Sequence, residues 1–261
     1  TTARTIRAEQ WRIQQHKGIE HIPSNDFSLY DHVLDTCAMV GAIPARFAWS
    51  GDEVDSDLVF AMARGRVADD ARASVPAMEM TKWFDTNYHY IVPEFRDGQT
   101  FRLADTKMID EYLEAQQIGV RARPVLLGPI SYLLLGKMAD GDRSPLTLVD
   151  AALPVYAEVL SRLAEDGAEW VQIDEPVLVT DLPSGAAEAY RRAYDFFSSA
   201  NQMVNVFLTT YFGALGDNLS LATSLPVDGL HIDLVGGSQQ LPDILVQWPE
   251  QRWLSLGVVD G

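Results

Sequence analysis

The stretch DAALPVYAEVLSRLAEDGAEWVQIDEP, residues 150–176, contains a helix pattern followed directly by a strand pattern. Val155, Val159 and Leu163 recur at the spacing of one helix face, and Gly167 is a residue type that ends helices. The run EWVQIDEP then has the short apolar pattern of a strand that stops in charged residues. A helix leading directly into a strand is the repeating unit of α/β folds.

Similar strand patterns recur along the chain. The clearest are RPVLLGP (123–129), VNVFLTT (204–210), GLHIDLV (229–235) and RWLSLGVVDG (252–261), and the weaker ones are IEHIPS (19–24) and the aromatic segment MEMTKWFDTNYHYIVPEF (78–95). The nearly continuous apolar runs are typical of parallel strands covered on both faces. No glycine-rich phosphate loop follows any of them, so a nucleotide-binding sheet loses its best support. We therefore favour a (β/α)8 TIM-type barrel over a doubly wound sheet.

The predicted barrel is incomplete. Seven strand candidates are present where a closed barrel needs eight. The chain opens inside a helical pattern, ARTIRAEQWRIQQHKG (3–18), and stops on a strand-like run that leaves an open sheet edge. We expect residues 1–261 to form one domain, most of a barrel that lacks its first strand and its C-terminal elements, within a longer protein.

Composition excludes several classes of protein. The 261 residues are 47% hydrophobic and 22% charged, as in folded domains. No apolar run approaches the roughly 18 residues of a membrane span, and the first residues lack a secretory leader pattern. The single cysteine, Cys37, rules out an internal disulfide and is expected to pack as a small hydrophobe. These features predict a cytoplasmic protein without a membrane partner.

The net charge of −17 argues against nucleic acid as a partner. The bland interpretation is a solvated acidic surface. The densest positive charges are Arg64, Arg66, Lys82, Arg121 and Arg123. An anionic ligand would have to be held by such locally placed cations against an unfavourable overall field.

Polar residues follow most of the candidate strands. They are Asp26, Asp31 and His32; Asn87, His89 and Glu94; Asp174 and Glu175; Thr209, Thr210 and Tyr211; His231 and Asp233; and Asp260. Because barrel enzymes place their chemistry at the carboxyl ends of the strands, these residues predict a small-molecule site there. Strand ends are polar in any barrel, so the pattern alone does not define the site.

Several of these residues allow two interpretations. Asp174 and Glu175 form either an acid–base pair or a structural strand end, and spacing does not decide between them. His89 lies between two tyrosines, which favours a packed, hydrogen-bonded histidine over a catalytic base. His231 and Asp233 alternate along a strand and so share a face, and with Asp174 they offer a candidate metal site. No H-x-H pair supports that site, and we disfavour it.

Lys82 stands out within the aromatic segment. It lies between Thr81 and Trp83, where a surface lysine has no evident reason to be. A lysine near aromatic walls is a good anchor for a carboxylate, whereas the alternative is a lysine that only reaches from the barrel rim to water. Trp83 and Phe84 could stack on a ring ligand, but core packing is the favoured interpretation.

Five motifs carry a resemblance to a known family. They are MTKWFDTNYHYIVPEF, RPVLLGPISYLLLGK, WVQIDEPVL, FLTTYF and DFSLYDHVLDT. In this order they closely resemble the N-terminal half of cobalamin-independent methionine synthase. The resemblance implies two barrels packed face to face after a duplication, and transfer of a methyl group from a 5-methyltetrahydrofolate polyglutamate to homocysteine. It places the catalytic zinc and the homocysteine site in a C-terminal barrel outside these residues, and basic residues for the folate tail upstream.

The same resemblance assigns a role to Lys82. The lysine of MTKWF is the family's contact to the folate polyglutamate tail, and here it is Lys82. The family's zinc-binding TTHMC-like strand end corresponds to TTYFG, which places Tyr211 and Gly213 at the histidine and cysteine positions, and HIDLV offers only Asp233 near the glutamate. The resemblance therefore implies no bound cofactor, no metal and no catalytic residue in this chain. It makes a structural role the favoured one for Asp174 and Glu175.

The leading functional hypothesis follows. The full-length protein is expected to be a methyltransferase, and this chain to bind the polyglutamate tail through Lys82 and brace the C-terminal barrel, without activity alone. One alternative is an interdomain scaffold with no ligand site. Another, less favoured, is a metal-dependent barrel hydrolase that uses His231, Asp233 and Asp174.

Overall fold

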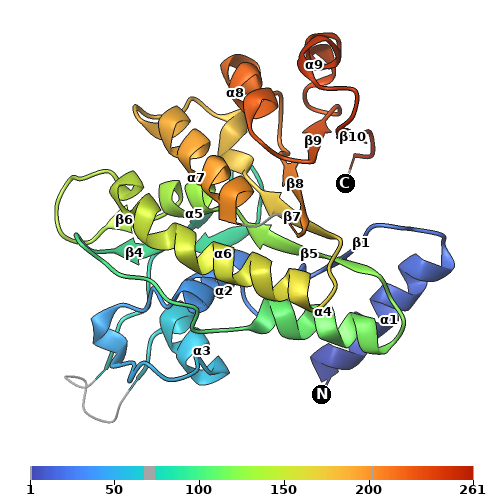
Figure 1. The fold of residues 1–261 in the computed structure, drawn as a ribbon. Coiled ribbons are helices and arrows are strands. Elements are labelled where there is room, and N and C mark those ends of the chain that lie inside the picture. The colour runs from blue at the N-terminus through green and yellow to red at the C-terminus, as the bar shows by residue number, and fades with distance from the viewer. Residues whose placement is uncertain (1, 68–73, 201–202, 261) are drawn as a thin grey trace.

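The computed structural model describes residues 2–67, 74–200 and 203–260, and its centre is a six-stranded sheet. All neighbouring strands in this sheet run parallel. In spatial order they are β1 (Ile22–Ser24), β5 (Ala122–Leu127), β7 (Trp170–Asp174), β8 (Asn205–Thr209), β9 (Gly229–Asp233) and β10 (Trp253–Gly257). The spatial order follows the chain order, and the sheet curls from β1 to β10 as in part of a (β/α) barrel (Figure 1).

One helix precedes the first strand of the sheet, and the others lie between successive strands along the chain. They are α1 (Thr2–His16), α2 (His32–Val40), α3 (Ser56–Arg64), α4 (Lys107–Gln117), α5 (Pro129–Leu134), α6 (Val149–Glu165), α7 (Ala186–Ala200), α8 (Leu219–Ser224) and α9 (Leu241–Gln247). Short 3-10 helices occupy Ala45–Phe47, Pro145–Leu148, Pro176–Val179, Gly216–Asn218 and Ser238–Gln240. Helices α4 and α6 lie side by side across one face of the sheet (Figure 1).

The sequence patterns located most of these elements. The helix predicted within 150–167 is α6, and Gly167 follows its end with φ +92°. The opening helical pattern is α1. Five strong strand patterns and the weaker one at 19–24 are strands of the sheet, so the predicted α/β barrel architecture is confirmed for the described residues.

The seventh strand prediction, residues 78–95, was wrong as part of the sheet. This segment forms the antiparallel hairpin of β2 (Met80–Lys82) and β3 (His89–Ile91). After it, β4 (Glu94–Phe95) pairs with β6 (Lys137–Met138) in a separate two-stranded sheet. The turn-forming residues of DTN (85–87) let the two halves of the segment pair with each other, and no helix intervenes to return the chain in parallel.

The two faces of the sheet differ in chemistry. Fully buried apolar side chains such as Val171, Ile173 and Leu208 point to one face, where they join one core with Val159 and Leu160 of α6. Side chains alternate along a strand, so the intervening residues point to the other face. These residues include Gln172, Asp174, Phe207, Thr209, His231 and Ser255. The inner face therefore carries the polar groups from which a site can be built.

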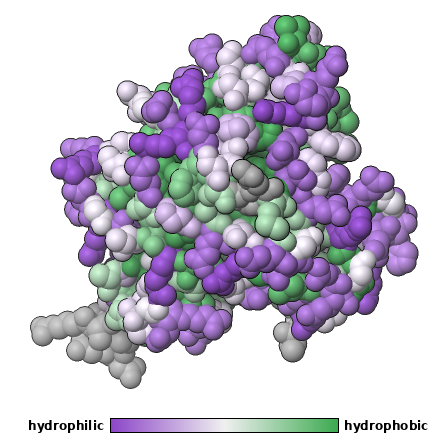
Figure 2. Space-filling view, in the orientation of Figure 1, coloured by the Kyte–Doolittle hydropathy of each residue, from purple (hydrophilic) through white to green (hydrophobic). Residues whose placement is uncertain are grey.

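The face of the molecule drawn in Figure 2 is mainly hydrophilic. Figure 2 shows hydrophilic residues over most of the visible face, with hydrophobic ones exposed between them, several near its middle. No helix in the described ranges is both long and apolar enough to cross a bilayer.

Candidate functional site

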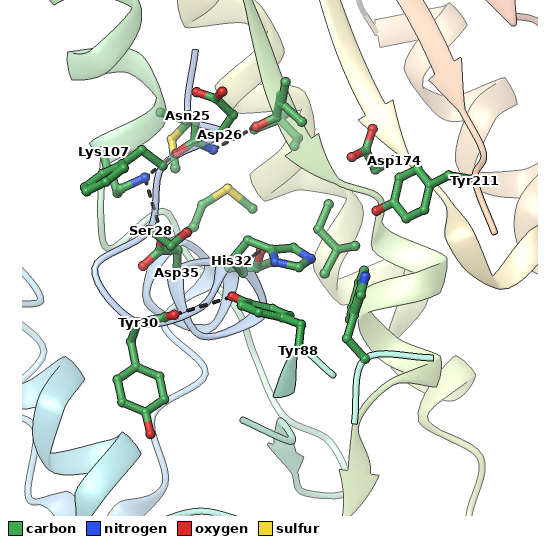
Figure 3. A pocket seen from close by; sticks show the side chains of 18 of the residues that line it. Asn25, Asp26, Ser28, Tyr30, His32, Asp35, Tyr88, Lys107, Asp174 and Tyr211 are labelled. Carbon is green, nitrogen blue, oxygen red and sulfur yellow. Dashed lines mark hydrogen bonds and ion pairs between the residues drawn. The ribbon is translucent and has the colours of Figure 1, made fainter. Parts of the chain in front are cut away.

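A pocket of about 570 Å3 opens at the carboxyl ends of the sheet strands. Its walls come from the segment after β1, the end of β5, the last residue of β7 and the segment after β8, with α2, α4 and the β2–β3 hairpin closing the sides. Asp26, His32, Asp174 and Tyr211 all line it (Figure 3). The prediction that polar strand ends converge is therefore correct for these four residues.

The other strand-end residues lie elsewhere. Those that do not line the pocket are Asp31, Asn87, His89, Glu94, Glu175, Thr209, Thr210, His231, Asp233 and Asp260. Glu94 accepts a bidentate hydrogen bond from Arg46 at 2.6 and 3.0 Å and so serves an ion pair away from the pocket. Proximity to a strand end was thus not a sufficient signal for a place in the pocket lining.

Asp31 fixes one side of the pocket. Its fully buried carboxylate caps α2 by accepting the backbone N–H of Leu34 at 2.8 Å, and it accepts the N–H of Ile91 in β3 at 3.1 Å. Burial raises the pKa of Asp31 to about 7. This side chain joins the helix that carries His32 to the hairpin that carries Trp83 and Tyr88.

His32 lies among the aromatic walls. Its ring meets Trp83 edge-on at 4.4 Å and stacks at 6.1 Å from Tyr88. Burial lowers the pKa of His32 to about 4, so the imidazole is neutral at pH 7. Its Nε2 atom has no hydrogen-bond partner among the described residues.

Lys107 at the start of α4 holds the opposite side together. Its ammonium donates to Asn25 Oδ1 at 2.7 Å and lies 3.3 Å from carboxylate oxygens of Asp35 and Glu111. The Asn25 amide donates in turn to the carbonyl of Val125 at 2.7 Å, which ties the segment after β1 to β5. Figure 3 shows Lys107 and Asn25 together at one end of the pocket.

Asp174 and Glu175 point into different surroundings. Asp174 lines the pocket, accepts from Gln172 Nε2 at 2.6 Å and is hydrogen-bonded to the Tyr211 hydroxyl. Burial raises its pKa to about 7, while the Gln172 and Tyr211 hydrogen bonds and the positive charge of Arg123 oppose the rise. Asp174 therefore faces the pocket on its own rather than as one of a carboxylate pair.

Glu175 is a buried acceptor for four donors. Its carboxylate receives the backbone N–H groups of Ile130 and Ser131 at the start of α5 and the hydroxyls of Tyr190 and Tyr194 from α7. The side chain is fully buried, and burial raises its pKa to about 7. Glu175 therefore links α5 to α7 through hydrogen bonds, and its buried carboxylate is not accessible to a ligand.

Lys82 lies beside the pocket rather than in its lining. Lys82 and His89 are cross-strand partners on one face of the hairpin, and the alternation of side chains puts Trp83 and Tyr88 on the other, toward the pocket. Lys82 is exposed, and its ammonium makes no ion pair within the parts of the chain that the structure describes. Its role in tail binding stays a prediction.

Other expectations for the aromatic segment fared differently. Trp83 is buried, as predicted for a core residue, and Phe84 packs edge-on against it at 5.1 Å. His89 is hydrogen-bonded to the carbonyl of Asn87 at 3.0 Å, but it is exposed, so the expectation of a packed histidine was wrong. The His89 side chain is exposed to solvent because it lies on the same face of the hairpin as Lys82. Cys37 is fully buried, as expected of a small hydrophobe.

The candidate metal-binding residues form hydrogen bonds with different partners instead of converging on one point. His231 Nδ1 lies 2.8 Å from Ser255 Oγ, and Asp233 Oδ1 accepts the backbone N–H groups that follow it in the loop after β9. Within residues 2–67, 74–200 and 203–260, no three His, Cys, Asp or Glu side chains are grouped to hold a metal ion. The hydrolase alternative therefore lacks a ligand set in this part of the chain.

Asn25, Asp35 and Lys107 are among the lining residues that the sequence interpretation missed. Asn25 directly follows a predicted strand and could have been found by the strand-end rule. Asp35 lies in α2 and Lys107 opens α4, and nothing in their local patterns signals that these helices border a pocket.

Comparison with known proteins identifies the chain's relatives. The family model described as "Cobalamin-independent synthase, N-terminal domain" matches residues 1–261. The 5-methyltetrahydropteroyltriglutamate–homocysteine methyltransferase of Parvibaculum lavamentivorans is 55% identical over 261 residues, covering 100% of this chain and 34% of the relative. The enzyme of the same name from Nitrobacter winogradskyi is 52% identical and covers 98% of this chain and 35% of the relative. The chain thus spans about a third of the length of these curated relatives.

Solved structures support the fold. A B12-independent methionine synthase from Shewanella sp. W3-18-1 matches with a TM-score of 0.60 at 12% identity, covering 97% of this chain and 80% of that one. A methyltransferase from Methanosarcina mazei matches with a TM-score of 0.55 at 13% identity, covering 97% and 69%. At such low identity these matches speak for the architecture alone. The family match over residues 1–261 and the relatives at 52% and 55% identity confirm the resemblance seen in the motifs. The chain belongs to the family of the cobalamin-independent synthase N-terminal domain.

Proposed function

We propose that this chain is the N-terminal part of a methyltransferase that makes methionine from homocysteine and a 5-methyltetrahydrofolate polyglutamate. Its task is to hold the polyglutamate tail and to brace the catalytic domain. The names of relatives more than 50% identical to the chain support the reaction. The chain covers only about a third of those relatives, so the chemistry is assigned to the remainder of the protein.

The exposed ammonium of Lys82, which forms no ion pair with the residues that the structure describes, is the observation that supports the tail-binding role. Neighbouring cations are engaged: Lys137 pairs with Glu79, and Arg46 pairs with Glu94. Lys82, by contrast, offers from the hairpin beside the pocket a positive charge that no carboxylate in the described ranges pairs. A polyglutamate tail brings several carboxylates, each of which gains from a cation.

The hairpin is well suited to present that charge. Trp83 N–H donates to the carbonyl of Tyr88 at 2.8 Å, and Asp31 holds Ile91 from the neighbouring helix. A rigid support reduces the entropy lost when a flexible tail binds. The position of Lys82 is therefore fixed by the fold even though its side chain is free.

Exposed apolar side chains near the pocket mouth support the bracing role. Leu29, Tyr88, Phe212 and Val235 are each at least 42% exposed and lie in loops at the carboxyl ends of the strands or on the hairpin. Apolar groups gathered at one end of a domain are typical of an interface. The partner we propose is the C-terminal barrel of the same protein.

Zinc has no place in the proposed role of this chain. The residues at the corresponding strand ends do not fit it: Tyr211 is bonded to Asp174, Gly213 has no side chain, and Asp233 accepts loop N–H groups. A zinc site needs soft or imidazole donors that converge on one point. The metal is proposed to lie in the C-terminal domain.

Tail binding can be tested with Lys82→Ala in the full-length protein. Affinities for methyltetrahydrofolate mono- and triglutamate are measured by titration calorimetry. Loss of one charge-assisted contact should weaken triglutamate binding about tenfold, with little change for the monoglutamate. Lys137→Ala is the matched control, because that lysine is nearby but already paired. Unchanged affinity and tail-length preference in Lys82→Ala would rule out the role and leave the scaffold alternative.

A further inference from the structure

The pocket at the carboxyl ends of the strands has few free hydrogen-bond donors. The Lys107 ammonium is held by Asn25 and two carboxylates, and the Asn25 amide is bonded to Val125. The Tyr88 hydroxyl donates to a backbone carbonyl at 3.4 Å, and the Tyr211 hydroxyl is bonded to Asp174. The strongest donors in the lining are therefore engaged within the protein.

Acceptors remain in excess. An ionised carboxylate can accept about four hydrogen bonds, and Asp174 receives two side-chain donors. Asp26, at the rim, receives none from another side chain within the described ranges. The lining carries three carboxylates, those of Asp26, Asp35 and Asp174, against the single ammonium of Lys107. A ligand that matches this pocket must donate hydrogen bonds and carry positive charge.

Aromatic rings form much of the remaining wall. Trp83, Tyr88, Tyr211 and Phe212 all line the pocket, and Tyr211 meets Phe212 edge-on at 4.8 Å. Aromatic faces attract cations and stack on flat groups. A volume of about 570 Å3 accommodates a compact ring compound.

We propose that this pocket binds a small planar organic cation, with an amidinium or protonated amine directed at Asp174 and its flat body against the aromatic wall. Figure 3 shows Asp174 and Tyr211 on one side of the pocket and His32 and Tyr88 below it, so the charge and the rings can be reached by one molecule. The site is distinct from the tail-binding face of the hairpin and does not depend on it.

The carboxylates of the pocket lining favour different places for the polyglutamate tail and for the proposed cation. A tail of carboxylates is repelled by Asp26, Asp35 and Asp174, so the polyglutamate chain belongs on the outer face with Lys82. A cation is repelled by Lys82 but attracted into the pocket. One hairpin thus presents opposite preferences on its two faces.

Benzamidine, benzamide and benzoate are matched probes for the site. They have similar size and shape but are positive, neutral and negative. Binding to the full-length protein is measured by ligand-observed NMR titration at pH 8. Benzamidine should bind, benzamide should bind at least about tenfold more weakly, and benzoate should show no binding.

Variants locate the binding. Asp174→Asn should weaken benzamidine binding about tenfold, and Asp26→Asn, at an exposed position, should weaken it several-fold. Asp233→Asn is the matched control, because this aspartate ends β9 but lies outside the pocket lining, and it should leave affinity unchanged. Lys82→Ala should also leave benzamidine binding intact, so failure of the tail-binding role is seen separately.

Three results overturn the proposal. They are no benzamidine binding at millimolar concentration, equal affinity for benzamidine and benzamide, or unchanged affinity in both Asp174→Asn and Asp26→Asn. Thermal unfolding of each variant shows whether it is folded. If Asp174→Asn does not fold, Asp26→Asn and the three probes decide the matter.

Discussion

The carboxylate of Asp31 accepts the backbone N–H of Ile91, 60 residues further along the chain, while it also caps α2. One buried side chain therefore sets both the start of a helix and the position of a hairpin. The walls of the pocket depend on this contact, because α2 carries His32 and the hairpin carries Trp83.

Asp31→Ala should lower the free energy of unfolding by about 2–3 kcal/mol, because two buried N–H groups lose their acceptor. Urea unfolding followed by circular dichroism measures the change. The matched control is Asp55→Ala, which removes an exposed cap from the N–H of Leu58 and should cost about 1 kcal/mol. Equal losses in the two variants would contradict a bridging role for Asp31.

Gly128→Ala should destabilise the protein by about 3 kcal/mol or more. A Cβ at this position would lie 2.2 Å from the Glu175 carboxyl group, which would have to leave its four donors. Gly98→Ala is the control. Its φ is +67°, and a Cβ added there would have no neighbouring atom within 4 Å among the described residues, so only backbone strain of about 1 kcal/mol is expected. A loss at Gly128 no larger than at Gly98 would show that Glu175 can move freely.

Stability should carry a pH dependence from the buried carboxyls. The folded-state pKa of Asp31 is about 7, above its unfolded value near 4, so the folded state holds this proton more tightly. The contribution of Asp31 to stability is then greatest at low pH and falls as pH rises from about 4 to 7, by at most about 1.4 kcal/mol per pH unit. Above pH 7 it levels off.

Asp31→Asn replaces the titrating carboxyl group with an amide, so comparison with the native protein isolates the contribution of Asp31. The difference in unfolding free energy between native protein and variant should shift in favour of the variant between pH 5 and pH 7, measured by urea unfolding at several pH values. A difference that stays constant over that range, or moves the other way, contradicts a raised pKa for Asp31.

Phe212→Ala should loosen the hairpin. Phe212 and Phe84 both have left-handed backbone conformations, with φ +72° and +50°, and their rings lie 5.4 Å apart. Their contact joins the loop after β8 to the turn of the hairpin, and its loss should speed amide hydrogen exchange in residues 80–91. Phe196→Ala, on the partly exposed side of α7, is a control that should leave that exchange unchanged.

Much of the fold could be predicted from the sequence, because buried parallel strands are short apolar runs between helical patterns. The segment 78–95 could not be placed, since a strand pattern says nothing about which strand it pairs with. The turn at residues 85–87 lets β2 pair with β3, and this local pairing takes the place of pairing with a strand of the main sheet.

The site was predicted in outline only. Asp26, His32, Asp174 and Tyr211 follow from the rule that strand ends meet at one edge. Lys107 does not, since it reaches the pocket through a helix packed against the sheet. His89 is exposed because it lies on the face of the hairpin that points away from the pocket, and its local sequence does not predict which face that is.

The hairpin's alternation has a consequence for selectivity. If β2 slipped by one residue against β3, every β2 side chain would change faces: the ammonium of Lys82 would enter the pocket, and Trp83 would leave its wall. The pocket would then gain a cation where it now has aromatic surface, and its charge preference would weaken or invert. The hydrogen bonds from the Trp83 N–H to the Tyr88 carbonyl and from the Val92 N–H to the Glu79 carbonyl hold the present register. Backbone pairing within the hairpin therefore maintains the discrimination between cation and anion on its two faces.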